Sequence, residues 1–340
     1  MSRPAEIDAF LAAAGWDDAE RRPLAGDASA RRYLLLVRGR SRAVLMDAPP
    51  ETGLSVAPFL AVADWLRGLG LSAPETYAAD IDLGLILSED LGDSLLARLA
   101  ADPAREAETY AAAVDLLAGL PSAPPPPAHG WSPPPYDAAV LVREMRLAVE
   151  WYIPAATGAP ASPDLAAEFD ALTAPLVAMA LEGPQVPVLR DFHAENLIWL
   201  PERRDDARIG LLDFQDLLIG HPAYDLVSLL NDARRDVPEA LRRALTARFH
   251  AATGRDPDAF AAAMAALSAQ RNLKILGLFV RLARRDGKPG YLRHLPRVRG
   301  LLARDLAHPA LAPLDVWAAR RLPPAEALLA APQPAAAAAP

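Results

Sequence analysis

A repeated pattern of short apolar runs and polar loops between Val186 and Asp225 is the sequence feature that most constrains the fold of this chain. The apolar run 186–189 leads into the polar loop 190–196, a second apolar run over 197–200, a polar turn over 201–206 and a third run that ends at Asp213. Short apolar runs bounded by turn residues predict buried strands. If the second and third runs pair as an antiparallel hairpin, Asn196 and Asp213 lie together across the ladder, and Asp191 lies in the loop at the same end.

These three side chains supply what metal-assisted phosphoryl transfer requires. Mg²⁺ needs oxygen ligands beside the phosphates, and the attacking hydroxyl needs a carboxylate to accept its proton. Asn196 and Asp213 are the predicted Mg²⁺ ligands. Asp191, five residues before Asn196, is the predicted base, as in the D-x-x-x-x-N loop of protein kinases. Each element alone also occurs in ordinary turns and helix caps, but their conjunction with a helix opening at 222–226 favours a kinase site over a structural coincidence.

The runs 189–196, 211–216 and 224–226 resemble the aminoglycoside phosphotransferase/choline kinase superfamily. From about Ala25 to Arg299 the chain is also similar to bacterial kinases of cell-wall (peptidoglycan) recycling that act on the anomeric hydroxyl of N-acetylmuramate and N-acetylglucosamine. The motifs of that second resemblance lie at 31–33, 46–51, 89–92, 150–152, 213–216 and 271–274. The resemblance implies an α+β, bilobal, protein-kinase-like fold. Its parts are a small β-rich N-lobe (1–88), a hinge (89–94) and a larger, mostly helical C-lobe (95–322), followed by a disordered Ala/Pro tail (323–340).

Composition agrees with a cytoplasmic small-molecule enzyme, which we expect to be a monomer. The 340 residues are 52% hydrophobic, which suffices for a large core. A net charge of −8 argues against nucleic acid as a partner, and the absence of cysteine excludes a disulfide scaffold and a thiol nucleophile. No run approaches the length of a membrane span, and the first residues lack the apolar core of a signal peptide, so we expect no membrane partner.

The nucleotide site is predicted in the N-lobe. The segment 23–30 is rich in small residues, which let backbone amides approach phosphate, and its Ser29 is a candidate ATP contact; an ordinary hairpin turn fits this segment equally well. By resemblance, the Glu89 carbonyl and the Leu91 amide bind the adenine edge. A capped helix entry is compatible with the same residues.

The third predicted strand, 42–47, lacks the cation that kinases place there for the α- and β-phosphates. Met46 and Asp47 occupy the corresponding positions. Arg31 or Arg32, on the neighbouring strand, is the predicted replacement, although two arginines on an exposed strand are also typical of a solvated edge.

Substrate residues are predicted in both halves of the C-lobe. Glu144 and Trp151 share a helix and offer a carboxylate and an aromatic face to a sugar, or else form part of a core stripe. His193 and Asp216 complete the predicted substrate set, and by resemblance the buried Asp225 supports the catalytic loop. The carboxylate of N-acetylmuramate would need a cation, for which there are three candidates: Arg143, Arg146 and Arg190.

The resemblance thus implies an ATP- and Mg²⁺-dependent kinase that phosphorylates the C1 hydroxyl of an N-acetylated amino sugar. Two alternatives stay open at this point. An aminoglycoside or amino-alcohol kinase would need an acidic cleft, which Glu195, Asp213 and Asp216 allow. A catalytically weak nucleotide-binding module is suggested by the missing strand cation. The presence of Asp191 favours an enzyme, because a module that only binds nucleotide does not need a base.

Overall fold

The computed structural model describes residues 2–24 and 31–330, and the chain divides into two compact units. Unit 1 consists of Met1–Pro134 and Leu189–Leu217, and unit 2 consists of Pro135–Val188 and Leu218–Pro340. The predicted hinge at 89–94 falls within unit 1, so the sequence-based division into lobes at that point stays a prediction.

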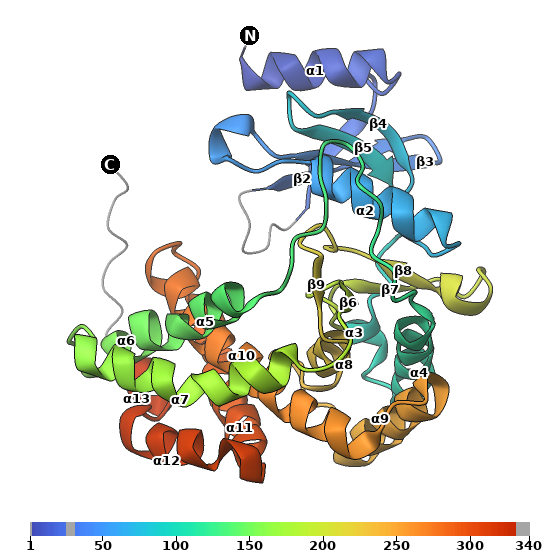
Figure 1. Cartoon of the computed structure of the whole chain (residues 1–340). Coiled ribbons are helices and arrows are strands. Elements are labelled where there is room, and N and C mark those ends of the chain that lie inside the picture. Colours follow the sequence, from blue (N-terminus) through green and yellow to red (C-terminus); the bar gives the residue numbers. More distant parts are fainter. Residues whose placement is uncertain (1, 25–30, 331–340) are drawn as a thin grey trace. The chain divides into compact units, whose positions relative to one another are not determined.

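Unit 1 is built on a five-stranded antiparallel sheet with strand order β1-β2-β3-β5-β4 (Figure 1). This confirms the predicted β-rich N-terminal part. The strand predicted at 42–47 is found at Ser41–Asp47, whereas the first strand, Glu20–Pro23, was not predicted. The strands are β1 (Glu20–Pro23), β2 (Arg32–Arg38), β3 (Ser41–Asp47), β4 (Thr76–Asp80) and β5 (Leu85–Glu89).

The two faces of this sheet pack against different helices. Helix α1 (Arg3–Ala13) lies over one face, where Ile7 and Leu11 join Leu36, Leu45 and Leu87 in a single core cluster. Helix α2 (Ala57–Gly68) lies on the opposite side of the sheet (Figure 1). Because successive side chains of a strand point to opposite faces, each strand divides its residues between these two environments.

The rest of unit 1 carries the predicted catalytic segment. Strands β7 (Leu197–Trp199) and β8 (Ile209–Leu211) form the expected antiparallel hairpin, with Leu197 opposite Leu211 and Trp199 opposite Ile209. Asp102 caps the longest helix of this part by accepting a hydrogen bond from the Ala104 amide. The remaining elements are η1 (Pro50–Thr52), α3 (Leu96–Leu99), α4 (Pro103–Gly119) and η3 (Asp205–Arg208).

Unit 2 is mostly helical and is arranged around α10 (Pro257–Arg284), which contacts α5, α7, α8 and α11. A two-stranded antiparallel sheet of β6 (Val186–Val188) and β9 (Leu218–Gly220) accompanies the helices. The other helices are α5 (Ala138–Leu147), α6 (Ile153–Thr157), α7 (Pro163–Leu181), α8 (Ala223–Leu230), α9 (Glu239–Thr253), α11 (Leu295–Leu306), α12 (Ala312–Arg321) and α13 (Glu326–Ala330), with the turns η4 (Pro289–His294) and η5 (Pro309–Leu311).

The helix predicted to continue through Trp151 is interrupted. After α5 the chain forms a π-helix, η2 (Ala148–Tyr152), and then α6. Gly277 of α10 lies directly against the start of this π-helix, because a Cβ at residue 277 would stand 2.0 Å from the Leu147 carbonyl oxygen. The helices therefore approach each other at a distance that only glycine allows.

The predicted disorder of the tail is wrong for its first part. Residues 326–330 form helix α13, which contacts α6 and η4, and Ala325 and Leu328 are buried. Burial of these apolar side chains orders a segment that composition alone assigns to a flexible tail. Residues 331–340 lie outside the described part of the chain.

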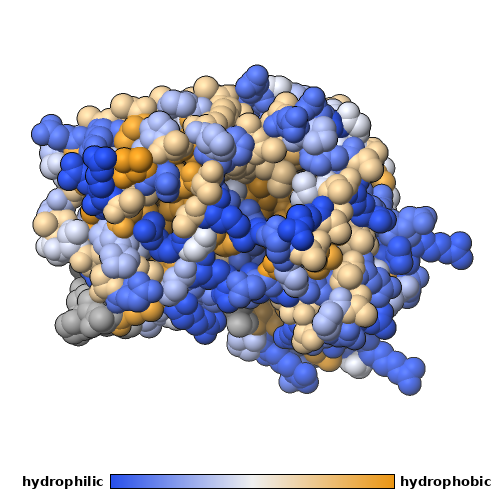
Figure 2. All heavy atoms as spheres, turned by 90° about the horizontal axis from the view of Figure 1, so that it is seen from below, coloured by the Kyte–Doolittle hydropathy of each residue, from blue (hydrophilic) through white to orange (hydrophobic). Residues whose placement is uncertain are grey.

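Hydrophilic side chains are spread over the face shown in Figure 2, and hydrophobic ones lie in small groups among them. The large apolar side chains are mainly inside, as in the buried Phe169, Leu176 and Trp317 of α7 and α12. Within residues 2–24 and 31–330, none of the helices is long and apolar enough to cross a membrane.

The contact at Gly277 predicts a large difference between two helical glycines. Gly277→Ala should lower the free energy of unfolding by about 1–3 kcal/mol, because the new methyl group meets a backbone carbonyl that cannot move aside. Gly300 of α11 has open space around its Cβ position, so Gly300→Ala should instead be neutral or stabilising by up to about 1 kcal/mol. Urea unfolding of both variants measures this difference. Equal effects would mean that α10 and Leu147 are not in close contact.

Candidate active site

The β7–β8 hairpin brings the predicted metal ligands together as expected. The strand register continues past both ends, since the Leu212 amide donates to the Asn196 carbonyl at 3.0 Å. Asn196 Nδ2 then lies 3.4 Å from Asp213 Oδ2. The proximity inferred from the alternating pattern is therefore present in the structure.

Asn196 also fixes the loop that carries Asp191. Its Nδ2 donates to the Asp191 carbonyl at 3.0 Å, and the Asp191 carbonyl accepts a second bond from the His193 amide at 3.0 Å. Arg190 and Asp213 both have a positive φ, +70° and +57°, which is unfavourable for residues other than glycine. Such backbone strain is typical of functional sites, where the surrounding structure holds a side chain in a required position.

Asp213 sits in an environment that disfavours its charge. Burial, followed by the negative charge of Asp191, raises the pKa of Asp213 to about 6, and Asp216 adds to this effect. A hydrogen bond from Gln215 Nε2 to Asp213 Oδ1 (2.6 Å) and the positive charge of Arg31 act in the opposite direction. The metal-free site therefore has an excess of negative charge that a cation would neutralise.

The residues present fit a magnesium ion. Asn196 directs its Nδ2 at the Asp191 carbonyl and at Asp213, which leaves its Oδ1 as a ligand. Gln215 is buried, and its Oε1 has no hydrogen-bond partner among the described residues, so a metal-bound water would satisfy it. No group of three or more His, Asp or Glu side chains suited to a metal occurs in the described ranges. Mg²⁺ needs only one or two carboxylates when substrate phosphates and water complete its shell.

The two predicted substrate residues of unit 1 lie close to this site in sequence and differ in exposure. His193 is buried within the catalytic loop, and its Nε2 is 3.3 Å from Asn196 Nδ2. Asp216 is exposed and acts on Asp213 through its charge. Phe214, between the two aspartates, is buried and stacks on Phe59 of α2 with ring centroids 5.0 Å apart.

The side chains of the predicted hinge residues Glu89 and Leu91 are held by contacts within unit 1. The Glu89 side chain accepts hydrogen bonds from Arg203 Nη2 (2.5 Å) and from the Glu75 amide (3.2 Å). The Leu91 side chain packs against Ile198 and Leu200 of the hairpin region. Its amide makes no hydrogen bond to any residue in the described ranges. The predicted contact Ser29 lies outside the described residues.

The remaining predicted residues belong to unit 2. Glu144 is buried in α5, where Lys274 Nζ lies 3.0 Å from its Oε1, Gln270 Nε2 donates to its Oε2 at 2.9 Å, and the Tyr136 hydroxyl donates to the same oxygen. Trp151 is half-buried in the π-helix, a feature frequent at functional sites. Asp225 is buried in the first turn of α8. That these residues act together with Asp191 stays a prediction.

Three partners in these networks were not predicted as site residues. Gln215 orients Asp213, Lys274 neutralises Glu144, and Arg203 fixes Glu89. Gln215 and Lys274 lie inside two of the motifs that carry the family resemblance, at 213–216 and 271–274, so a signal for them existed. Arg203 lies in a polar turn with no motif, and only the fold brings it to Glu89.

Comparison with known proteins identifies the family. The model of the phosphotransferase enzyme family matches residues 20–263. The chain belongs to that family. A curated N-acetylmuramate/N-acetylglucosamine kinase from Caulobacter vibrioides is 40% identical, covering 94% of this chain and 97% of the relative. A kinase of the same name from Pseudomonas aeruginosa is 34% identical, with 85% of each chain covered. The superfamily resemblance and the kinase prediction are thus confirmed.

A solved structure supports the same fold. The choline kinase of Streptococcus pneumoniae superposes with a TM-score of 0.59 at 13% identity, covering 89% of this chain and 100% of that structure. An identity this low bears on the fold alone, and it confirms the predicted protein-kinase-like class. This phosphotransferase is therefore a kinase, and the family implies ATP as its phosphoryl donor.

The electrostatics of Asp213 predict opposite effects of one substitution on function and on stability. A carboxyl group whose folded pKa is raised, from 3.8 to about 6, stabilises the fold below pH 4, and this contribution is lost as pH rises through 6. Asp213→Asn should therefore raise the stability of the metal-free protein at pH 8, by up to about 3 kcal/mol, while Mg²⁺-dependent nucleotide binding is lost.

Thermal unfolding in EDTA and nucleotide titration with and without Mg²⁺ measure these two effects. Glu202→Gln is the matched control, since Glu202 is exposed in the β7–β8 turn and should leave the Mg²⁺ dependence unchanged. Unchanged Mg²⁺ dependence in Asp213→Asn would show that Asp213 is a turn residue.

Proposed function

We propose that this phosphotransferase transfers the γ-phosphoryl group of ATP to the C1 hydroxyl of N-acetylmuramate, N-acetylglucosamine or both, giving the sugar 1-phosphate. The observation that carries the proposal is the juxtaposition of Asn196 and Asp213 beside the Asp191 loop, in a chain 40% identical to a kinase named for these two sugars. We further propose that it acts as a monomer in the cytoplasm, where ATP is available.

Asp191 is the proposed base. Asn196 Nδ2 and the His193 amide both donate hydrogen bonds to the Asp191 carbonyl, so the loop is fixed and the Asp191 carboxylate keeps a defined position. The anomeric hydroxyl is the most acidic hydroxyl of a free sugar, because the ring oxygen withdraws electron density from C1. A carboxylate held at this hydroxyl can therefore accept its proton as the oxygen attacks phosphorus in line with the leaving group.

Asn196 and Asp213 would hold Mg²⁺, which when bound neutralises the phosphate oxygens and so eases transfer. Gln215 keeps the Asp213 carboxylate oriented through its 2.6 Å hydrogen bond. The Leu91 amide and the Glu89 carbonyl are the proposed contacts of the adenine edge. The ion pair of Glu89 with Arg203 keeps that segment in place.

Charge at Glu144 favours a neutral acceptor over a cationic one. An aminoglycoside or amino alcohol needs free carboxylates, but the Glu144 carboxylate already has Lys274 at 3.0 Å and two neutral donors on its other oxygen. A carboxylate neutralised in this way gains little from a substrate ammonium group. It can still accept hydrogen bonds from sugar hydroxyls, with Trp151, His193 and Asp216 as the other proposed contacts.

The lactyl carboxylate of N-acetylmuramate requires a cation, and the three candidate arginines are not equivalent. Arg146 is already engaged by Asp170, with Nε 2.9 Å from Oδ1. Arg190 has a positive φ directly before Asp191, so its backbone is tied to the catalytic loop. Arg143 is exposed on α5 one residue before Glu144. Arg143 is the proposed ligand of the three, because it is exposed and has no ion pair with any residue that the structure describes.

The position of the phosphoryl group on the product tests the proposal. Incubation with Mg·ATP and either N-acetylated sugar should give a 1-phosphate, which phosphorus-coupled NMR of the anomeric carbon identifies directly. A 6-phosphate would refute the assignment of the acceptor hydroxyl. Consumption of an aminoglycoside or of choline, without sugar product, would favour the cationic-substrate alternative.

The role of Asp191 predicts a separation of catalysis from nucleotide binding. Asp191→Asn should lower kcat by about 100-fold to 10,000-fold, because the base is lost, and should leave the Kd of Mg·ADP unchanged. Glu202→Gln is the matched control: Glu202 is an exposed acid in the β7–β8 turn, and its variant should keep the wild-type kcat. An Asp191→Asn kcat within about tenfold of wild type would exclude Asp191 as the base.

A further inference from the structure

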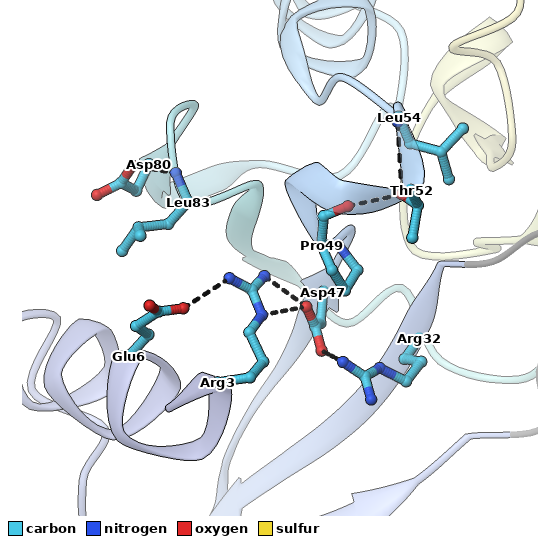
Figure 3. Close-up of polar contacts among 9 residues, drawn as sticks. All are labelled: Arg3, Glu6, Arg32, Asp47, Pro49, Thr52, Leu54, Asp80 and Leu83. Carbon is cyan, nitrogen blue, oxygen red and sulfur yellow. Dashed lines mark hydrogen bonds and ion pairs between the residues drawn. The ribbon is translucent and has the colours of Figure 1, made fainter. Parts of the chain in front are cut away.

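Met46 and Asp47 occupy the part of the third strand where kinases carry the phosphate-binding cation, and the surroundings of Asp47 are specific. Asp47 is 3% exposed, and both of its carboxylate oxygens are in ion pairs. Arg3 of α1 binds Oδ1 through Nη2 (2.5 Å) and Nε (2.9 Å), and Arg32 of β2 binds Oδ2 through Nη2 (2.7 Å). Figure 3 shows the two guanidinium groups on two sides of the Asp47 carboxylate.

This network fixes which face of the sheet Asp47 and Arg32 occupy. Arg32 stands directly opposite Asp47 in the β2–β3 ladder, and directly opposed residues share a face. That face is the one covered by α1, because Arg3 belongs to α1. Leu45 and Leu36, which point to the same side of β3 and β2 as Asp47 and Arg32, also lie in the core beneath α1. Arg32 therefore points to the α1 side and is held there by Asp47.

Arg31 belongs to the opposite face. Side chains alternate along an extended strand, so the residue before Arg32 shares its side with Tyr33 and, across the ladder, with Met46. Met46 is buried and apolar, so β3 presents no cation on that face. Arg31 is half-buried although it precedes the strand, whereas the Arg32 side chain is 61% exposed.

A second observation connects the face of Arg31 with the metal site. Helix α2 lies on the side of the sheet opposite α1 (Figure 1), and its Phe59 stacks on Phe214, the residue directly after Asp213, with ring centroids 5.0 Å apart. The face to which Arg31 belongs is therefore the one next to the segment that carries Asp213, where the phosphates of a metal-bound nucleotide belong.

We infer that Arg31, and not Arg32, is the cation that binds the nucleotide phosphates in place of the missing strand lysine. Its guanidinium group suits this role, because a planar fork of donors can hold two phosphate oxygens at once. The Arg3–Asp47–Arg32 network occupies the other face and holds the neighbouring arginine away from the phosphates. This inference rests on the proposed nucleotide site and adds to it a specific phosphate ligand.

Comparison of a ligand with phosphates and one without them tests the inference. Calorimetric titration of the full chain with Mg·ADP and with adenosine should show that Arg31→Ala weakens ADP binding by about tenfold to 100-fold, the value of a lost charged hydrogen bond. Adenosine binding should stay within about twofold, because adenosine has no phosphate for Arg31 to hold. Arg31→Lys keeps the charge without the fork and should fall between wild type and Arg31→Ala.

Arg32→Ala is the matched control, being the neighbouring arginine on the same strand. It should bind both ligands as the wild type does and unfold at a lower temperature, because Asp47 loses an ion-pair partner. Loss of ADP binding in Arg32→Ala but not in Arg31→Ala would overturn the inference, as would equal losses for ADP and adenosine in Arg31→Ala. If the wild type binds neither ligand, the proposed function itself fails, and not the choice of arginine alone.

Discussion

The repulsion between two carboxylates, Asp191 and Asp213, is the constraint on which the candidate site depends. Burial and this repulsion raise the pKa of Asp213 to about 6, and the backbone at Asp213 and at Arg190 is held in a region unfavourable to residues other than glycine. A fold that keeps such an arrangement loses stability in the absence of a cation, and sites that bind charged ligands characteristically show this loss. Asn196, Gln215 and the hairpin register all hold the two acidic groups in place.

The site could be predicted from sequence where it is local. Asn196 and Asp213 are 17 residues apart, and their strands are consecutive apolar runs joined by one polar connection, so the alternating pattern favours this pairing. The same is true of the strand predicted at 42–47, which is an apolar run with polar ends, whereas the first strand of that sheet, Glu20–Pro23, is exposed along its length and had no such signal. The protein-kinase-like fold came from the motifs and not from the strands, since many folds contain such hairpins.

Other features depend on residues distant in sequence and had no local signal. Lys274 and Gln270 reach Glu144 from another helix, and the spacing of 126 residues between Gln270 and Glu144 exceeds anything that periodicity can reveal. The π-helix after α5 was missed because its sequence fits an ordinary helix, and its close contact with Gly277 comes from a helix distant in sequence. The tail helix was missed because an Ala- and Pro-rich composition predicts disorder, whereas burial of the Leu328 side chain orders this segment.

The choice between Arg31 and Arg32 shows why a charge pattern cannot be interpreted without the face of the strand. In sequence the two arginines are equivalent neighbours, and Asp47 is a departure from the kinase pattern, which has a phosphate-binding cation on this strand. In the sheet one residue of displacement reverses the direction of a side chain, so Asp47 pairs with Arg32 on the α1 face and contributes nothing to the opposite one. Arg31 belongs to that opposite face, and its charge lowers the pKa of Asp213, while burial and the charges of Asp191 and Asp216 raise it. The raising effects are the larger, so the site disfavours the charged form of Asp213 and suits a divalent ion that arrives with the nucleotide.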